Sequence, residues 1–354
     1  EDFAAQLRRA SELELEDVEQ AHAAAVAARR AATTPTEALR ADLMVAGLER
    51  QRGRYSEALA AAKAGVAGAQ QQRDPALRAE FLLLIARTQW NRSELPASLE
   101  TYLELMPLAE RLGDPQLLAR VHNGLANTQA SAGQWERART HYESAQAFAT
   151  EAGDRALLAD IRNNLGNFYF NRFQDYATAR EHHLAALALR EALGHRRGLA
   201  DSNLNLGHIA DAVGDHAEAI ARFTRARDTY EALGLKRQLA NALRALGAAQ
   251  RKSGRPDEAV ATLGAAAALA QTLGSAAIDA PIYRELAAAH EARGDWRAAL
   301  EFERKRSAME TAMLDERTRQ KIVALNERSD AERHAREMAL LHRERAVQEA
   351  ELAQ

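Results

Sequence analysis

Small and apolar residues recur along this chain at an almost constant interval of 40 residues. Seven pairs, each an aliphatic residue followed by alanine or glycine, are spaced by 40, 40, 40, 41, 40 and 40 residues: Val45-Ala46, Ile85-Ala86, Leu125-Ala126, Leu165-Gly166, Leu206-Gly207, Leu246-Gly247 and Leu286-Ala287. A small residue follows thirteen positions after the first member of most pairs, as at Ala138, Ala219 and Ala259. Such a period indicates a repeated supersecondary unit that buries its core against its neighbours.

Glycine divides each unit into two predicted helices. Eight residues after the first member of the pair, five units carry glycine (Gly53, Gly133, Gly214, Gly254 and Gly294), whereas Ser93 and Phe173 hold this position in the other two. A second series of glycines closes the unit: Gly113, Gly153, Gly194, Gly234 and Gly274. Glycine just past a helix readily adopts the left-handed conformation that ends it. The pattern predicts an all-α chain with seven helix pairs, A and B, over residues 37–313, preceded by a degenerate capping repeat over residues 1–36.

The last unit lacks its closing glycine, because Leu314 occupies that position. From Asp295 to Gln354 the chain has 60 residues without glycine or proline, which as one helix would extend about 90 Å at 1.5 Å per residue. Its apolar residues, among them Ile322 and Leu341, follow an irregular stripe rather than a regular heptad. Residues 314–354 are therefore expected to form a long C-terminal helix that pairs weakly as a coiled coil in a homodimer; a single solvated helix is the alternative.

Composition narrows the possible functions. The chain of 354 residues is 47% hydrophobic and 27% charged with a net charge of −3, which predicts a folded protein and gives no indication of a nucleic-acid partner. The absence of cysteine excludes disulfides, thiolate metal sites and cysteine nucleophiles. No run of 18 apolar residues occurs, so we expect contact with a membrane only through a segment outside this chain. The start at Glu1 favours a fragment of a longer protein.

No enzymatic motif is apparent. The sequence has no phosphate-binding loop, no HExxH motif and no arrangement typical of a Ser/His/Asp triad, so we expect a protein that is not an enzyme and has no cofactor or metal. His182 and His183 are the most suggestive neighbours, but adjacent residues on a helix diverge by about 100° and do not face one metal together. We expect both to be solvated side chains on a B helix.

Two segments resemble tetratricopeptide repeats: "NNLGNFYFNRFQDYATAREHHLAAL" and "LNLGHIADAVGDHAEAIARFTRA". The resemblance rests on Leu-Gly in helix A, glycine at the turn, and Ala219, Phe223 and Ala226 in helix B, and it covers about residues 37–313. It implies an α-solenoid, a right-handed superhelix of helix pairs whose A helices line a concave groove. Such solenoids are usually binding surfaces rather than catalysts.

The resemblance also indicates which side chains face the groove. Relative to the first residue of each pair, positions −2, −1, +2 and +5 of helix A lie toward the concave side. The candidate binding residues are Arg87, Trp90, Asn123, Asn127, Asn163, Asn164, Asn167, Phe170, Asn205, His208 and Arg244. Asparagine amides can bind a peptide backbone, and the arginines can bind a carboxylate, so a peptide or protein ligand is expected. The alternatives are asparagines that only join neighbouring A helices, and a small molecule stacked on Trp90 or Phe170.

The segment "HAREMALLHRERAVQEAELAQ" resembles the helix that precedes a membrane span in bacterial sensor proteins with tetratricopeptide repeats. In these proteins the output is commonly a GGDEF diguanylate cyclase or a histidine kinase. The first hypothesis is therefore a periplasmic sensory input domain that binds a peptide or protein and transmits through a helical stalk to an output domain missing from this chain. The second is a cytoplasmic adaptor that dimerises through its C-terminal helix. The regulatory part of a caspase-like CHAT protease is a third, weaker hypothesis.

Overall fold

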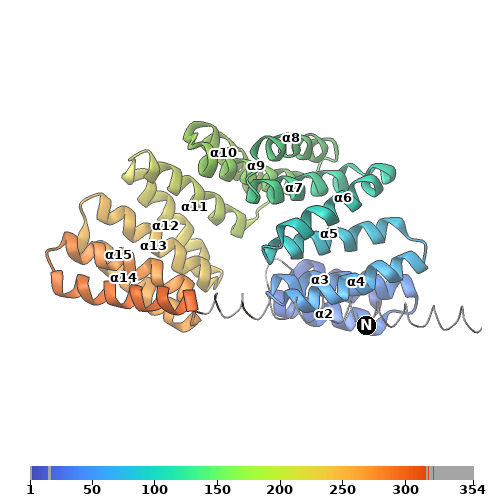
Figure 1. Cartoon of the computed structure of the whole chain (residues 1–354), viewed down its shortest axis with the longest axis horizontal. Coiled ribbons are helices and arrows are strands. Elements are labelled where there is room, and N and C mark those ends of the chain that lie inside the picture. The colour runs from blue at the N-terminus through green and yellow to red at the C-terminus, as the bar shows by residue number, and fades with distance from the viewer. Residues whose placement is uncertain (1, 15–16, 316–317, 319–321, 323–354) are drawn as a thin grey trace, which may run out of the picture. The chain divides into compact units, whose positions relative to one another are not determined.

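A computed structural model describes residues 2–14, 17–315, 318 and 322, and no strand occurs among them. The chain divides into two compact units, Glu1–His195 and Arg196–Gln354. In the first unit the helices are α1 (Phe3–Leu13), α2 (Val18–Ala31), α3 (Pro35–Gln51), α4 (Tyr55–Gln71), α5 (Pro75–Asn91), α6 (Leu95–Leu112), α7 (Pro115–Ser131), α8 (Trp135–Glu151), α9 (Arg155–Phe168), the π-helix η1 (Tyr169–Phe173) and α10 (Tyr176–Ala192) (Figure 1). The second unit contains α11 (Arg196–Ala212), α12 (His216–Ala232), α13 (Lys236–Lys252), α14 (Pro256–Leu273), α15 (Ala276–Ala292) and a further helical stretch over residues 296–315.

Each unit is an α-solenoid of helix pairs, as the repeat pattern predicts. In the first unit every α-helix packs on the next one along the chain, and the A helices α3, α5, α7 and α9 also contact each other in that order. In the second unit the A helices α11, α13 and α15 do the same. Within each unit, a B helix packs on the A helix of its own repeat and on the A helix of the next repeat, as in tetratricopeptide repeats. The A helices therefore form a continuous layer within each unit.

Several helix starts follow directly from the local sequence. The side chain of Asp74 accepts a hydrogen bond from the backbone N–H of Leu77, and Pro75 occupies the first helical position, where no N–H is needed. Thr34 and Glu37 form a capping box at the start of α3. These caps fix the starts of the A helices α5 and α3.

The turns between helices A and B have left-handed residues where the sequence predicts them, with one exception. Gly53, Gly133, Gly214, Gly254 and Gly294 all have φ between 76° and 86°, and Ser93 takes the same left-handed conformation at φ 62°. In the unit of Leu165, however, the left-handed residue is Gln174 (φ 52°) and not Phe173. The extra residue of the 41-residue interval is accommodated in η1, since a π-helical turn holds one residue more than an α-turn.

Five B helices, α6, α8, α10, α12 and α14, place a large side chain in the core at the same repeat position. These residues are Tyr102, Tyr142, His183, Phe223 and Leu263, and each is at most 3% exposed. The expectation that His183 is solvated is therefore wrong, because this position points into the core, where neighbouring repeats carry an aromatic or leucine side chain. His182 is half-buried and stacks on Tyr169 with ring centroids 5.5 Å apart. Burial lowers the pKa of both histidines.

The helix that follows α15 continues past Leu314, as the missing glycine predicts. Residues 296–315 are helical, and Leu314 is 65% exposed. Of the expected stalk over residues 314–354, most lies outside the described residues, as does its coiled-coil pairing. Among the described helices, none combines the length and the apolar character that a membrane span requires.

Candidate functional site

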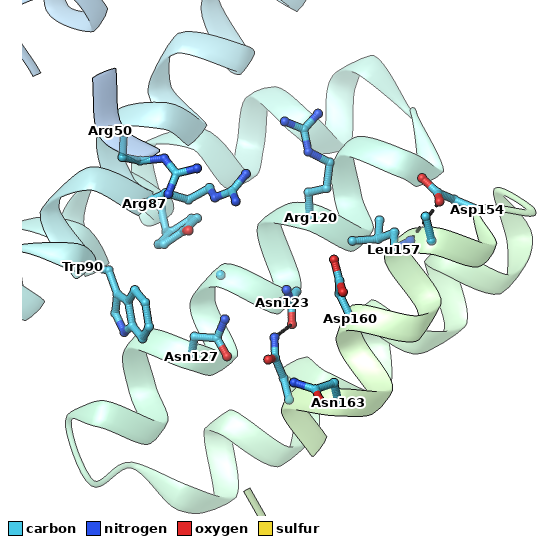
Figure 2. Close-up of a pocket in the computed structure, with 14 residues that line it drawn as sticks. Arg50, Arg87, Trp90, Arg120, Asn123, Asn127, Asp154, Leu157, Asp160 and Asn163 are labelled. Carbon is cyan, nitrogen blue, oxygen red and sulfur yellow. Dashed lines mark hydrogen bonds between the residues drawn. The ribbon is translucent and has the colours of Figure 1, made fainter. Parts of the chain in front are cut away.

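A cavity of about 440 Å³ opens on the A-helix layer of the first unit, between α3, α5, α7 and α9. Six of the predicted binding residues line it: Arg87, Trp90, Asn123, Asn127, Asn163 and Asn164. Figure 2 shows Arg50 and Arg87 close together on one side of this space, with Asp160 and Asn163 on the other. The resemblance to tetratricopeptide repeats therefore identified six of the fourteen residues that line this cavity.

Arg50 is one of several cavity-lining residues that the sequence pattern did not identify. It stands five positions after Val45 on α3, the same repeat position as Trp90 on α5, and this register is the sequence signal that identifies it. Its Nη1 donates to Oδ1 of Asn91 at 3.2 Å, while its buried Nε has no hydrogen-bond partner. Burial, with the nearby charge of Arg87, lowers the pKa of Arg50 to about 10, so it remains a cation at neutral pH.

Arg50 and Arg87 form the cationic part of the cavity. Among the described residues, neither has a carboxylate partner at ion-pair distance, and Arg87 makes no hydrogen bond. Arg120, by contrast, pairs with both carboxylate oxygens of Glu80 at 2.7 and 2.8 Å. Although Glu14 lies near enough to Arg50 to raise its pKa, neither guanidinium group has a carboxylate at ion-pair distance, so the pair is suited to an anionic group of a ligand.

The negative charges of the cavity are already engaged. Asp160 accepts from Nη2 of Arg190 at 3.0 Å. Asp154 caps α9 by accepting from the N–H of Leu157 at 2.9 Å and also accepts from Nε2 of Gln116 at 2.6 Å. Since these carboxylates have partners of their own, the electrostatic preference of the cavity is set by the arginines.

The asparagines have both structural and ligand-facing groups. Nδ2 of Asn164 donates to Oδ1 of Asn123 at 3.1 Å, which joins α9 to α7. The hydroxyl of Tyr142 donates to Oδ1 of Asn127 at 2.6 Å. An amide offers two N–H donors and one oxygen acceptor, so among the described residues the amide N–H groups of Asn123 and Asn127 and the amide oxygen of Asn164, all from cavity-lining residues, have no hydrogen-bond partner. The bond between Asn164 and Asn123 joins neighbouring A helices as the interhelical alternative expects, whereas Asn127 bonds to the B helix α8.

A second cavity of about 380 Å³ adjoins the first and shares Trp90, Asn127 and Asn164 with it. Asn167, Asn171 and Arg172 also line it. Trp90 is 38% exposed, and its Nε1 donates to Oγ of Ser131 at 3.1 Å, which fixes the indole between the two cavities.

The π-helix η1 shapes this second cavity. It contains Asn171 and Arg172, and the guanidinium of Arg172 lies 4.9 Å from the ring centroid of Trp135. Phe170, also on η1, packs on Tyr176 with ring centroids 5.5 Å apart and lines neither cavity. Together the two cavities form a polar groove with an aromatic side, which we call the asparagine groove.

The remaining predicted residues, Asn205, His208 and Arg244, lie on α11 and α13 of the second unit. His208 packs edge-on against Phe223 with ring centroids 5.0 Å apart, and burial together with Arg244 lowers its pKa to about 4. Burial also lowers the pKa of Arg244. A role for these three residues in ligand binding remains a prediction.

Comparison with known proteins agrees with this architecture. Two sequence models described as tetratricopeptide repeat match residues 157–232 and 242–277. The chain therefore contains tetratricopeptide repeats. No curated protein matches the chain by sequence.

Solved structures with similar folds include signalling proteins. A signal transduction ATPase with numerous domains (STAND) and a tetratricopeptide repeat sensor, from Pyrococcus horikoshii, is 16% identical with a TM-score of 0.69, covering 86% of this chain and 48% of that one. The apo quorum sensor NprR from B. thuringiensis is 15% identical with a TM-score of 0.65, covering 87% of each chain. A Rap protein in complex with Competence and Sporulation Factor is 15% identical with a TM-score of 0.58, covering 88% of this chain and 99% of that one.

The fold has the character of a scaffold rather than of a catalyst. A tetratricopeptide solenoid is suited to protein or peptide binding and is generally non-catalytic. Among the described residues, no group of three or more histidine, aspartate or glutamate side chains is arranged to bind a metal ion.

Proposed function

We propose that this chain is a sensory input domain that binds an extended peptide segment in the asparagine groove of its first unit. The observation that carries the proposal is the pair Arg50 and Arg87, two cations without carboxylate partners beside a row of amides. An acidic side chain or terminal carboxylate of the peptide pairs with the arginines. The amides of Asn123, Asn127 and Asn164 bind the peptide backbone, which has the same donors and acceptors along any sequence.

The similar structures support a signalling role. One of them is described as a quorum sensor, one as a protein with a tetratricopeptide repeat sensor, and one is bound to Competence and Sporulation Factor. In our proposal the helix that begins at residue 296 carries the signal to an output domain outside this chain, of the GGDEF or histidine kinase type, with the repeats in the periplasm.

Binding is tested with a library of dye-labelled synthetic heptapeptides whose C-terminal residue is acidic, followed by fluorescence anisotropy. Arg87→Gln removes one of the two free charges and is expected to weaken binding roughly 10- to 100-fold. Arg139→Gln is the matched control, because Arg139 lies on the B helix α8 and is 47% exposed. Binding by no member of the library, or equal affinity for wild type and Arg87→Gln, would overturn the groove assignment.

The second candidate is a cytoplasmic adaptor in which the same groove holds a segment of a partner protein. It is favoured by the half-exposed Trp90, which suits a protein side chain as well as a free peptide. The flanking sequence of the gene discriminates between the two. A leader before Glu1 and an apolar segment of about 20 residues after Gln354 would support the sensor, whereas their absence would support the adaptor.

A further inference from the structure

A third cavity, of about 700 Å³, lies on the other side of the arginines, between α1, α3 and α5. Its apolar walls come from Phe3 and Leu7 on α1, Leu43 and Met44 on α3, and Leu83 and Leu84 on α5, while Arg8, Glu14, Arg40 and Glu80 also line it. Glu80 pairs with Arg120, and Glu14 accepts a hydrogen bond from Gln51. Arg50, Arg87 and Arg120 line this cavity as well as the asparagine groove. The arginines therefore stand between an apolar space and a polar one.

Gly47 opens this apolar cavity. It lies on α3 three residues after Met44 and three before Arg50, so it shares their face of the helix. A Cβ added at Gly47 would meet no heavy atom within 4 Å. Glycine is a poor residue for a helix interior, and no close helix contact at this position requires it.

The repeat register makes Gly47 more informative. Gly47 stands two positions after Val45, where the next three units carry Arg87, Asn127 and Asn167. These three side chains all line the cavities described above. The repeat that contains Val45 thus has no side chain at the position that the next three repeats use to line the site, and the result is open space.

We propose that this cavity, bounded by Gly47, accepts aliphatic side chains of the bound peptide, placed directly next to the acidic group that pairs with Arg50 and Arg87. The inference rests on the proposed function and adds the specificity of the ligand. Apolar walls that end at Arg50 and Arg87, two cations without a carboxylate at ion-pair distance, match a ligand whose aliphatic part adjoins an anion. The amides beyond the arginines select a peptide as the occupant, because they match the groups of a backbone.

The test fills the cavity rather than damaging its walls. Gly47→Leu adds a side chain into open space and replaces glycine by a strong helix former, so the variant should fold with an unchanged or raised thermal midpoint. Gly264→Leu on α14 is the matched control, because a Cβ there also meets nothing within 4 Å and Gly264 lies in the second unit. Two sets of dye-labelled heptapeptides are compared, with an acidic C-terminal residue preceded by either two leucines or two serines.

Wild type is expected to bind the leucine peptides roughly 10- to 100-fold more tightly than the serine peptides. Gly47→Leu should remove this preference, and Gly264→Leu should retain it. Equal affinity of wild type for both sets, or a full preference in Gly47→Leu, would overturn the specificity pocket. If Arg87→Gln still weakens both sets in that case, the asparagine groove stands without the pocket; if Arg87→Gln has no effect either, the proposed function fails as well.

Discussion

The Cα of Gly207 on α11 packs directly against the ring of Phe223 on α12: a methyl group added at Gly207 would lie 2.6 Å from Cε1 of Phe223. Phe223 is fully buried, so its ring has no space to move away. The same relationship joins Gly166 to His183 and Gly247 to Leu263, with added-Cβ distances of 2.5 Å in both pairs. Glycine in helix A is thus what allows helix B to approach in these repeats.

Gly207→Ala is expected to lower the free energy of unfolding by about 1–3 kcal/mol, because overpacking displaces a buried ring. Gly264→Ala, at a helical glycine with open space around it, should instead raise stability by up to about 1 kcal/mol through helix propensity. Urea denaturation followed by circular dichroism measures both. Equal effects of the two substitutions would contradict the packing argument.

Acid sensitivity should arise in part from His183. Burial, with a contribution from Arg190, lowers its pKa to about 4 from an ordinary value of 6.5. The folded state therefore favours the neutral imidazole of His183. Its contribution to the free energy of unfolding is fully present above about pH 6.5 and is lost as the pH falls toward 4. His183→Phe, which copies Phe223 at the same repeat position, should reduce the fall in thermal midpoint between pH 6.5 and 4. Identical pH profiles for the variant and wild type would contradict the prediction.

Asn127 should contribute to stability through Tyr142. The Tyr142 side chain is 3% exposed, and its hydroxyl donates to Asn127 at 2.6 Å. Asn127→Ala leaves this hydroxyl without its partner and should cost about 1–3 kcal/mol of unfolding free energy. Adding Tyr142→Phe to Asn127→Ala should recover part of the loss, which chemical denaturation can measure.

Asn167→Ala is the control for this prediction, because no hydrogen bond is formed by the Asn167 side chain in the described part of the chain. Its effect on unfolding should stay within about 0.5 kcal/mol. If Asn167→Ala lowered the free energy of unfolding as much as Asn127→Ala, the hydrogen bond from Tyr142 would not explain the effect at Asn127.

The C-terminal segment is expected to form a concentration-dependent homodimer. Leu314 and Ile322 are 65% and 53% exposed, and each would gain about 1.5–3 kcal/mol if a partner buried it fully. Truncation at residue 313 should therefore give a monomer. Sedimentation equilibrium over a range of concentrations provides the measurement. A monomer at high concentration for the whole chain, or an unchanged dimer after truncation, would argue against a dimeric stalk.

Most of the fold could be predicted because its determinants are local or periodic. Glycines at fixed intervals end the helices, and within each unit the 40-residue period places each A helix beside the next one. The resemblance to tetratricopeptide repeats also identified Arg87, Asn123 and Asn127 as residues of one surface.

The sequence by itself thus determined the helix pairs, their turns and the polar face of the A helices, whereas tertiary structure decided how the individual side chains are used. Only packing shows that His183 is buried, because burial depends on the neighbouring helix and not on polarity. Only the folded chain shows that Tyr142 engages Asn127, while Arg50 and Arg87 have no carboxylate partner. The space beside Gly47 is likewise set by three helices distant in sequence. Such contacts join residues from different helices, so no local pattern encodes them.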